Sequence, residues 1–438
     1  MSETAEVPTR AKQAESTPAE WDWVERTVWT ERMLAALGNG VKGNKGFSLI
    51  DKVYRLSTLQ AAWEQVKVNR GAAGIDGQSI EGFAANAERY LSELAKDLEE
   101  GRYIPQAVRR VEIPKAGGKT RPLGIPTVKD RIVQTAVKRV IEPIFENEFL
   151  PMSYGFRPGR SCKDALREVD GYLKEGYTHV VDADLKGYFD SIPHPRLKER
   201  IGERISDGRL LDLLAGWLRQ DIVKEMARWT PTGGTPQGAV ISPLLANIYL
   251  HPLDEIMLQR GYHMVRYADD FVILCKSTEQ AHTALEEVKA WVEENGLTLH
   301  PDKTHIGDCR IEGQGFEFLG YRFEAGKRWV REKSLQRFKD KIREKTRRSR
   351  GDSLTRIIAD LTPIIRGWYG YFKHADPWIF PRLDGFIRRR LRAIRRKQEK
   401  RPGFGQCHAD HKRWPNAYFA ALGLFTMTEA RMSASRSR

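Results

Sequence analysis

Apolar residues recur at regular spacing over most of the chain beyond residue 46, and this pattern predicts its helices. From about 47 to 100 it predicts helices interrupted by a glycine-rich break at 70–77. Thr127 is expected to begin a further helix, because Asp130 follows three residues later as in a capping box. Apolar residues then recur at helical spacing at Ile132, Val133, Ala136, Val137 and Val140.

Short apolar stretches bounded by turn residues predict strands and hairpins. The predicted strands are 179–185, a hairpin of 107–114 with 120–125, a hairpin within 264–275, and a hairpin of 316–323 with 327–330. Further helices are predicted at 198–220, 243–257 and 278–295, and the chain beyond 330 is helical and basic to about 400. Hairpins amid helices indicate an α+β fold.

The basic charge is concentrated in the last third of the chain. The formal net charge of the 438 residues is +15, whereas Lys327–Arg350 alone carries +9 and Ile387–Arg401 carries +8. A solvated helix face explains a single charge run, but two separated runs that hold the whole excess favour a polyphosphate partner. The sequence therefore predicts nucleic-acid binding.

Carboxylates interrupt two segments that otherwise have the composition of buried strands. HVVDADLKGYFDSIPH contains Asp182, Asp184 and Asp190, and MVRYADDFVILC contains the adjacent pair Asp269-Asp270. Adjacent carboxylates at the tip of a buried hairpin repel each other, and a bound Mg²⁺ removes that cost. The alternative is an ordinary acidic turn, which does not require apolar residues on both sides.

At this point the chain resembles a known family. The motif Tyr267–Asp270 (YADD) resembles the YxDD motif of reverse transcriptases, and other motifs accompany it in the family's order. These are IPKAGGKTRPLGIPTVKDRIVQ, YGFRPGRS, VVDADLKGYFDSIPH, GGTPQGAVISPLLANIYL, GLTLHPDKTHI and FEFLGYRF. The segment LTPIIRGWYGYF resembles the maturase region of group II intron-encoded proteins. The sequence is therefore similar to group II intron-encoded reverse transcriptase/maturases from about residue 47 onward.

The resemblance implies a right-hand polymerase with an antiparallel-sheet palm, followed by an α-helical thumb. We expect a disordered or N-terminal extension at 1–46, fingers and palm at 47–325, a thumb/maturase domain at 326–400 and a small DNA-binding tail at 401–438. Some relatives carry an HNH endonuclease, for which the residues after the thumb leave no room, so we expect none here.

The resemblance also implies roles for individual residues. Asp184 and Asp269 would bind two Mg²⁺ ions, with Asp270 assisting. Phe189 would block a ribose 2′-hydroxyl and so favour dNTPs, although core packing is the alternative for this ring. Lys303 would neutralise or protonate pyrophosphate, although it could be a plain surface lysine. The remaining predicted nucleotide contacts are Lys115, Arg121, Gln237 and Gly238.

The C-terminal half is expected to bind RNA, because aromatic residues lie between the two basic runs. The predicted RNA-binding residues are Arg366, Lys373, Arg388, Arg389 and Arg392. The implied partners are a group II intron RNA, target DNA with a primer 3′-end, and dNTPs, in a ribonucleoprotein whose protein component is a monomer or a homodimer. No run of about 18 apolar residues occurs, so we expect no membrane span. The resemblance implies a cytoplasmic bacterial protein, at the nucleoid when on DNA.

Three other functions stay open at this stage. A splicing cofactor whose polymerase has decayed would have lost its catalytic residues, yet Asp184, Gln237, Asp269 and Asp270 are intact. A domesticated reverse transcriptase of a defence system would carry the same motifs. An RNA-dependent RNA polymerase is disfavoured by the aromatic residue at 189.

Overall fold

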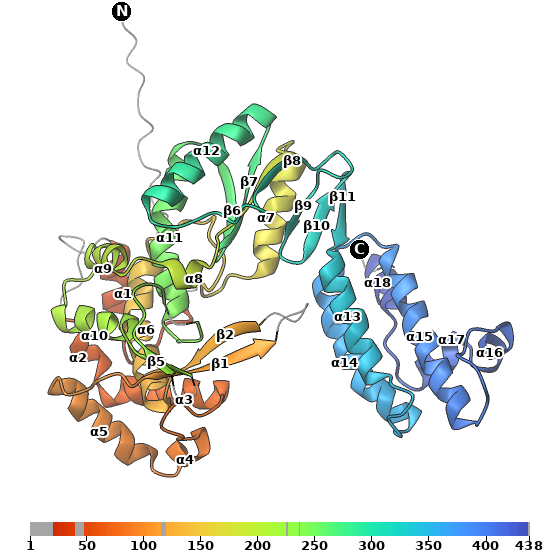
Figure 1. Cartoon of the computed structure of the whole chain (residues 1–438), viewed down its shortest axis with the longest axis horizontal. Helices are drawn as coiled ribbons and strands as arrows, with labels where there is room; N and C mark the ends of the chain where they lie inside the picture. Colours follow the sequence, from red (N-terminus) through yellow and green to blue (C-terminus); the bar gives the residue numbers. More distant parts are fainter. Residues whose placement is uncertain (1–20, 40–47, 115–119, 225–226, 236, 437–438) are drawn as a thin grey trace, which may run out of the picture. The chain divides into compact units, whose positions relative to one another are not determined.

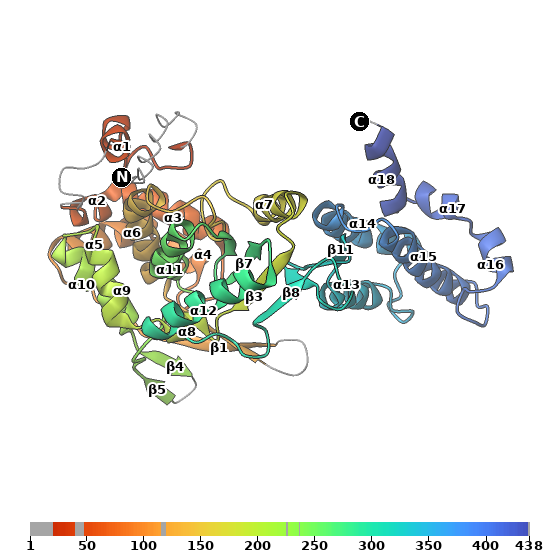
Figure 2. The ribbon, with the colours of Figure 1, turned by 90° about the horizontal axis from the view of Figure 1, so that it is seen from above.

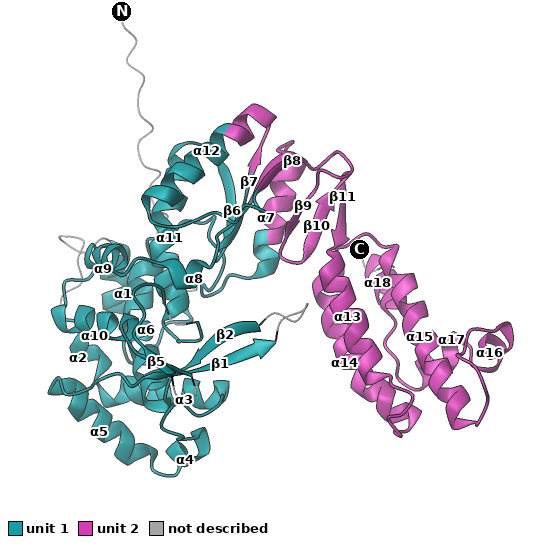
Figure 3. Cartoon of the chain, viewed as in Figure 1, with its two compact units in different colours: residues 1–165, 183–273, 283–304 teal, residues 166–182, 274–282, 305–438 magenta. Residues whose placement is uncertain are grey.

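The computed structural model describes residues 21–39, 48–114, 120–224, 227–235 and 237–436. The chain forms two compact units: unit 1 comprises 1–165, 183–273 and 283–304, and unit 2 comprises 166–182, 274–282 and 305–438 (Figure 3). The division runs through four elements: α7 (Cys162–Lys174), β3 (His179–Asp184), β7 (Asp270–Cys275) and α12 (Thr278–Glu294). Residues 1–20, expected to be disordered, and Lys115 lie outside the described residues.

Unit 1 combines a helical layer with short strands. Its helices are α1 (Glu31–Gly38), α2 (Ile50–Val53), α3 (Leu56–Asn69), α4 (Ile80–Ala84), α5 (Ala87–Glu99), α6 (Val128–Glu146), α8 (Tyr188–Ser191), α9 (His194–Gly202), α10 (Gly208–Leu218) and α11 (Ser242–Gln259). Its strands are β1 (Val108–Pro114), β2 (Thr120–Ile125), β4 (Ile222–Lys224), β5 (Ala227–Trp229) and β6 (His263–Tyr267).

Helix α6 forms the centre of the helical layer. The predicted cap is confirmed, since the Thr127 hydroxyl accepts a hydrogen bond from the backbone N–H of Asp130 at 3.1 Å. The five apolar residues that predicted this helix are all fully buried. Helices α2, α3 and α11 pack against α6, and Figures 1 and 2 show α6 among the surrounding helices. Burial on several sides explains why apolar positions here are more numerous than on a one-sided surface helix.

The hairpin of β1 and β2 is confirmed as predicted. Its antiparallel register runs from Arg109 opposite Ile125 to Pro114 opposite Thr120. β4 extends this sheet by pairing in parallel with β1, and β5 follows at the edge, in the order β2-β1-β4-β5. The hairpin carries Arg121 on β2.

The single helix predicted over 198–220 is wrong, because the chain breaks between α9 and α10. Asp207 causes the break by acting as the N-cap of α10, where its Oδ1 accepts from the Leu210 N–H at 3.1 Å. The other carboxylate oxygen, Oδ2, accepts from the N–H groups of Leu49 at 2.6 Å and Ile50 at 2.8 Å. One side chain therefore caps one helix and ties down the start of another, which a local apolar pattern does not reveal.

A second four-stranded sheet has the order β6-β7-β3-β8, where β8 is His305–Asp308. β3 pairs antiparallel with β8, from His179 opposite Asp308 to Asp182 opposite His305. β6 and β7 form the hairpin predicted around the acidic turn. The α+β fold class is confirmed.

Unit 2 continues with three short strands and then helices: β9 (Phe316–Phe318), β10 (Tyr321–Glu324), β11 (Lys327–Val330), α13 (Glu332–Lys345), α14 (Leu354–Phe372), α15 (Ile379–Gln398), α16 (His408–Arg413), α17 (Asn416–Ala421) and α18 (Met427–Arg436). The single strand predicted over 316–323 is wrong. Leu319 and Gly320 have φ of 48° and 84°, so they turn the chain between β9 and β10. The sheet order is β11-β10-β9.

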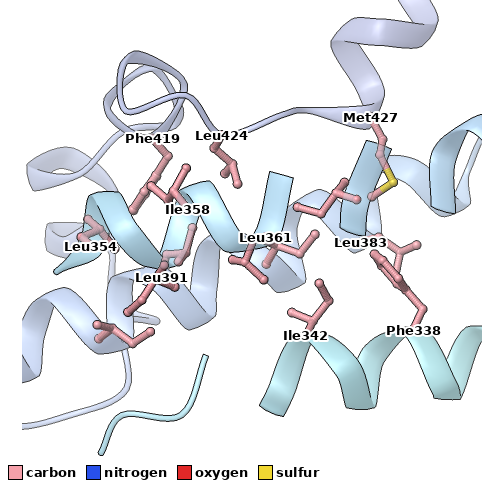
Figure 4. Close-up of a cluster of buried hydrophobic side chains, with 14 of the residues drawn as sticks. Phe338, Ile342, Leu354, Ile358, Leu361, Leu383, Leu391, Phe419, Leu424 and Met427 are labelled. Carbon is pink, nitrogen blue, oxygen red and sulfur yellow. The ribbon is translucent and has the colours of Figure 1, made fainter. Parts of the chain in front are cut away.

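One hydrophobic core, with aliphatic and aromatic side chains, holds the helices of unit 2 together (Figure 4). α13 contributes Phe338 and Ile342, and α14 and α15 contribute Leu361 and Leu383 from facing surfaces. The last helix reaches the same core through Met427. The two basic runs lie mainly on α13 and α15, whose apolar faces are buried in this core, so most of their charged side chains stay at least partly exposed.

Candidate active site

Strand β3 delivers Asp184 to the end of a buried sheet. Val180, Val181 and Ala183 are buried, whereas the Asp184 side chain keeps a quarter of its surface exposed. Its carboxylate forms an ion pair with the ammonium of Lys303. The segment that carries this lysine is anchored to the same strand, because the His300 N–H donates to the Asp184 carbonyl at 2.7 Å.

Asp269 occupies the tip of the β6–β7 hairpin. It follows Ala268, whose φ of 62° lies in the left-handed region, and precedes Asp270, the first residue of β7. Burial raises the pKa of Asp269 above its usual value, and the charge of Asp184 raises this pKa further. The cations of Arg121 and Lys303 act in the opposite direction. The carboxylates of Asp184 and Asp269 therefore lie close enough to repel each other.

This pair of carboxylates fits a divalent cation. A cation between the two oxygen donors would offset their mutual repulsion, much as the Lys303 ammonium offsets the charge of Asp184. Among the described residues, no group of three or more His, Cys, Asp or Glu side chains forms a metal site by itself. Magnesium tolerates such a small protein contribution, because phosphate oxygens and water complete its octahedral shell.

A series of side-chain hydrogen bonds connects the β1–β2 hairpin to the region after β3. Arg121 Nε donates to Gln237 Oε1 at 2.9 Å, and Gln237 Nε2 donates to Asp190 Oδ2 at 2.7 Å. The backbone confirms this proximity, since the Gly124 N–H donates to the Gln237 carbonyl at 2.6 Å. Arg121 and Gln237, two of the residues predicted around the nucleotide, are therefore brought together from segments far apart in the sequence.

Gly238 makes this arrangement possible. Its φ is 108°, and a Cβ atom there would lie 2.4 Å from the carbonyl oxygen of Gly124. The close approach of the two backbones therefore requires glycine at 238. The resemblance assigns Gly238 a contact with the nucleotide, whereas the neighbour that the structure shows is strand β2 of the protein itself.

Phe189 lies half-buried on the short helix α8, in contact with two other rings. Its ring centroid is 6.3 Å from that of Phe156 and 5.6 Å from that of Tyr188, both in edge-on geometry. The Phe189 carbonyl accepts a hydrogen bond from the Thr235 N–H at 2.6 Å, which fixes the backbone below the ring. Phe156 is 45% exposed and has a φ of 61°.

Sequence reasoning missed two of these neighbours. The motif gives Asp190 no role of its own, yet its carboxylate accepts a hydrogen bond from the Gln237 amide. Phe156 was part of a quoted motif without a role of its own, yet it supports the ring of Phe189. In the sequence, Asp190 is a further carboxylate of its motif, and Phe156 is an aromatic residue between a glycine and an arginine. Neither feature specifies which side chain it contacts.

Comparison with known proteins now identifies the family. The profile described as "Reverse transcriptase (RNA-dependent DNA polymerase)" matches residues 113–323, and the one described as "Group II intron, maturase-specific domain" matches 335–414. Protein YkfC of Escherichia coli (strain K12) is 36% identical over 322 residues, which cover 62% of this chain and 83% of YkfC. The chain belongs to the group II intron reverse transcriptase/maturase family.

Two further relatives match smaller shares of this reverse transcriptase/maturase. The group II intron-encoded protein LtrA of Lactococcus lactis subsp. cremoris is 39% identical over 45% of the chain, but that region is 33% of LtrA. Among solved structures, a chain titled "Partial Cas6-RT-Cas1--Cas2 complex" aligns with 57% of this chain and 42% of its own length, at 26% identity and a TM-score of 0.35. That TM-score is too low to support an argument.

The maturase-specific region of this family member contains the residues predicted to bind RNA. Arg366 lies on α14 with its guanidinium 5.4 Å from the ring of Phe425, and the exposed Lys373 follows the end of that helix. Arg388 is half-buried and Arg389 exposed on α15.

Arg392 differs from the other predicted RNA-binding residues because it is 2% exposed. Its guanidinium donates to the Trp414 carbonyl at 3.0 Å and to Asn416 Oδ1 at 3.1 Å. A cavity of about 300 Å³ adjoins these side chains and is lined by Gly385, Arg388, Arg389, Arg392, Gln406, His411 and Asn416. Arg392 therefore supports the wall of a basic cavity.

None of the helices in the described part of the chain combines the length and apolarity that crossing a bilayer requires.

The raised pKa of Asp269, which burial causes first and the charge of Asp184 increases, predicts a stabilising substitution. Because the folded-state pKa of Asp269 is raised, ionising this carboxyl costs stability as the pH rises past 3.8, its ordinary pKa, and the full cost is present above the folded-state pKa. In metal-free buffer at neutral pH, Asp269→Asn should therefore raise the Tm by about 2–4 °C, the effect of about 1 kcal/mol in a protein of this size.

The measurement is thermal unfolding in EDTA at neutral pH and again below pH 4, where the difference should disappear. Asp212→Asn, at an exposed position on α10, is the matched control and should leave the Tm unchanged. An unchanged or lowered Tm for Asp269→Asn at neutral pH would contradict the stability cost of ionising the Asp269 carboxyl.

Proposed function

We propose that this protein extends a primer 3′-end with dNTPs on an RNA template, using two Mg²⁺ ions, and that it does so as part of a group II intron ribonucleoprotein. The observation that carries the polymerase proposal is the placement of Asp184 at the end of β3 and of Asp269 directly before β7, because these two strands are neighbours in one sheet. A carboxylate from each of two strands is the minimum protein contribution to a paired-metal site for nucleotidyl transfer.

The proposed mechanism assigns each side chain a task in the reaction. Asp184 and Asp269 hold the metal ions, with Asp270 beside them at the start of β7. Ions held there would supply the charge that activates the 3′-hydroxyl and stabilises the leaving pyrophosphate. Arg121 reaches the triphosphate, since a guanidinium suits bidentate phosphate contact. Lys303, already beside the Asp184 carboxylate, offsets or protonates the pyrophosphate charge.

The remaining nucleotide contacts shape the pocket. Gln237 presents its amide beside the base and template, and its bonds to Arg121 and Asp190 hold it in place. Gly238 keeps this loop against β2. Lys115 lies outside the described residues, and its proposed contact with the triphosphate rests on the family resemblance.

Loss of either metal-binding carboxylate should abolish DNA synthesis. Asp184→Asn and Asp269→Asn each remove a charge that the ions require, so primer extension on an RNA template should fall by at least about 1000-fold, as for other transition-state electrostatic groups. Binding of RNA, measured by filter retention, should stay unchanged. Asp212→Asn is the control. Synthesis that survives both substitutions would exclude this metal site, and an inactive wild-type protein that still binds RNA would favour the splicing-cofactor alternative.

Phe189 is proposed to discriminate against ribonucleotides. Its ring is half-exposed and braced by Phe156 and Tyr188, a rigid position from which it could exclude a 2′-hydroxyl by contact. Phe189→Ala should therefore reduce the preference for dNTPs over NTPs by at least about 10-fold, measured as the ratio of kcat/KM values. Phe404→Ala, at an exposed ring in unit 2, should leave this ratio unchanged. An unaltered ratio in Phe189→Ala would assign the ring to packing alone.

The maturase-specific region is proposed to bind intron RNA and to assist its splicing. The polymerase is proposed to copy that RNA when the intron is inserted into target DNA. The support is the placement of two basic runs, +9 and +8, on helices whose apolar faces form a common core. Arg366, Lys373, Arg388 and Arg389 present the charge, and Arg392 organises the cavity beside them. Polyphosphate binding by such clusters is driven by counterion release.

The salt dependence of RNA binding tests this assignment. Arg388→Ala and Arg389→Ala should each weaken binding of structured intron RNA and reduce the slope of log K against log salt by about 0.7–0.9 per lost phosphate contact. Arg89→Ala on α5, where Arg89 pairs with Glu93 at 3.6 Å, is the control and should not change the slope. Slopes equal to the wild type in both variants would place the RNA elsewhere.

A further inference from the structure

A fully buried ion pair lies behind the acidic turn of unit 1. Arg266 on β6 and Asp254 on α11 have no exposed side-chain surface. The pairing is bidentate, with Nε to Oδ1 at 2.7 Å and Nη2 to Oδ2 at 2.5 Å. Burying two charges costs desolvation energy that an apolar pair would avoid, so such a pair is weak evidence of a role in stability. Its location suggests another role.

The third nitrogen of Arg266 reaches the turn itself. Nη1 donates to the Ala268 carbonyl at 2.9 Å and contacts Asn247 Oδ1 at 3.0 Å. Asn247 in turn donates from Nδ2 to the Gly155 carbonyl at 2.8 Å. A Cβ atom on Gly155 would lie 2.3 Å from the Ala268 backbone nitrogen, so that glycine packs directly against the turn. These contacts hold the backbone of the turn at Ala268 in place.

The turn needs such support because of its backbone geometry. Ala268 has a φ of 62°, which is unfavourable for a residue that bears a Cβ atom. Its carbonyl belongs to the same rigid peptide plane as the N–H of Asp269. A hydrogen bond to that carbonyl therefore fixes the plane from which the Asp269 side chain projects.

We propose that Arg266 is a positioning residue, held by Asp254 and Asn247, that orients Asp269 for metal binding through the Ala268 carbonyl. The inference rests on the proposed metal site and adds to it the buried group that sets its geometry. A charged, forked side chain is required because one guanidinium must satisfy a carboxylate, an amide oxygen and a backbone carbonyl at once.

The test separates positioning from stability by comparing Arg266→Met, Asp254→Leu and the double variant. Each single variant leaves one buried charge unpaired and should unfold at a lower temperature. The double variant removes both charges and should regain most of the lost Tm. It lacks the bond to Ala268, so its kcat should stay at least about 10-fold below wild type, with a Mg²⁺ requirement raised at least about 5-fold. Affinity for primer–template should not change.

Metal binding provides a readout that does not depend on activity. Mn²⁺ titration of the free protein, followed by electron paramagnetic resonance, should show weaker binding in the double variant than in the wild type, with Asp269→Asn as the reference for a lost ligand. Arg139→Lys, at a partly buried ion pair with Glu25 (2.8 Å), is the control and should leave Mn²⁺ affinity unaltered. If the wild type lacks polymerase activity, the proposed function fails, whereas the Mn²⁺ comparison still tests Arg266.

Two outcomes would overturn the inference. A double variant that regains Tm, kcat and Mn²⁺ affinity together would make the ion pair purely structural. If the double variant remains unstable, the Arg266→Lys variant distinguishes positioning from a purely structural role. It keeps the charge opposite Asp254 but loses the forked guanidinium. A near-normal Tm with a raised Mg²⁺ requirement supports positioning, and near-normal values of both exclude it.

Discussion

The repulsion between the carboxylates of Asp184 and Asp269 is the constraint on which the reaction centre depends. Two like charges near each other, one of them largely buried, oppose folding, so other interactions must hold them in place. Burial of the apolar residues of β3, β6 and β7 stabilises the strands that hold the two carboxylates in place. The cations of Arg121 and Lys303 offset part of the repulsion. A site with this electrostatic cost is suited to recruit divalent cations, because their binding relieves it.

The same site depends on close contacts between backbones. Gly238 meets β2, and Gly155 meets the acidic turn, at distances that exclude any side chain. Such contacts leave little freedom to the segments that carry Gln237 and Asp269. A reaction centre assembled from distant segments needs this rigidity, since small displacements of metal ligands cost much of the catalytic rate. In unit 2, a hydrophobic core stabilises the helices, and the other faces of these helices carry the positive charge.

Much of the fold was predictable because it depends on local patterns. The cap at Thr127, the buried face of α6 and the hairpins around 115–119 and 268–269 follow from residue spacing and turn chemistry. The failures occurred where distant segments intervene. Asp207 interrupts a helical pattern because it also binds backbone N–H groups of residues 49 and 50. Leu319 and Gly320 divide an apolar stretch that has the composition of one strand.

By itself, the sequence determined which residue types are present for the chemistry: carboxylates in apolar strands, an arginine in a hairpin strand, a glutamine among glycines, and basic helices near the C-terminus. Its motifs also placed the chain in the right family. Tertiary structure alone decided which of these groups interact, including Lys303 with Asp184, Asp190 with Gln237, and Arg266 with the carbonyl of Ala268. The reason is physical: pattern and propensity act over a few residues, whereas the energy of a charge or hydrogen bond depends on distance in space, which only the folded chain sets.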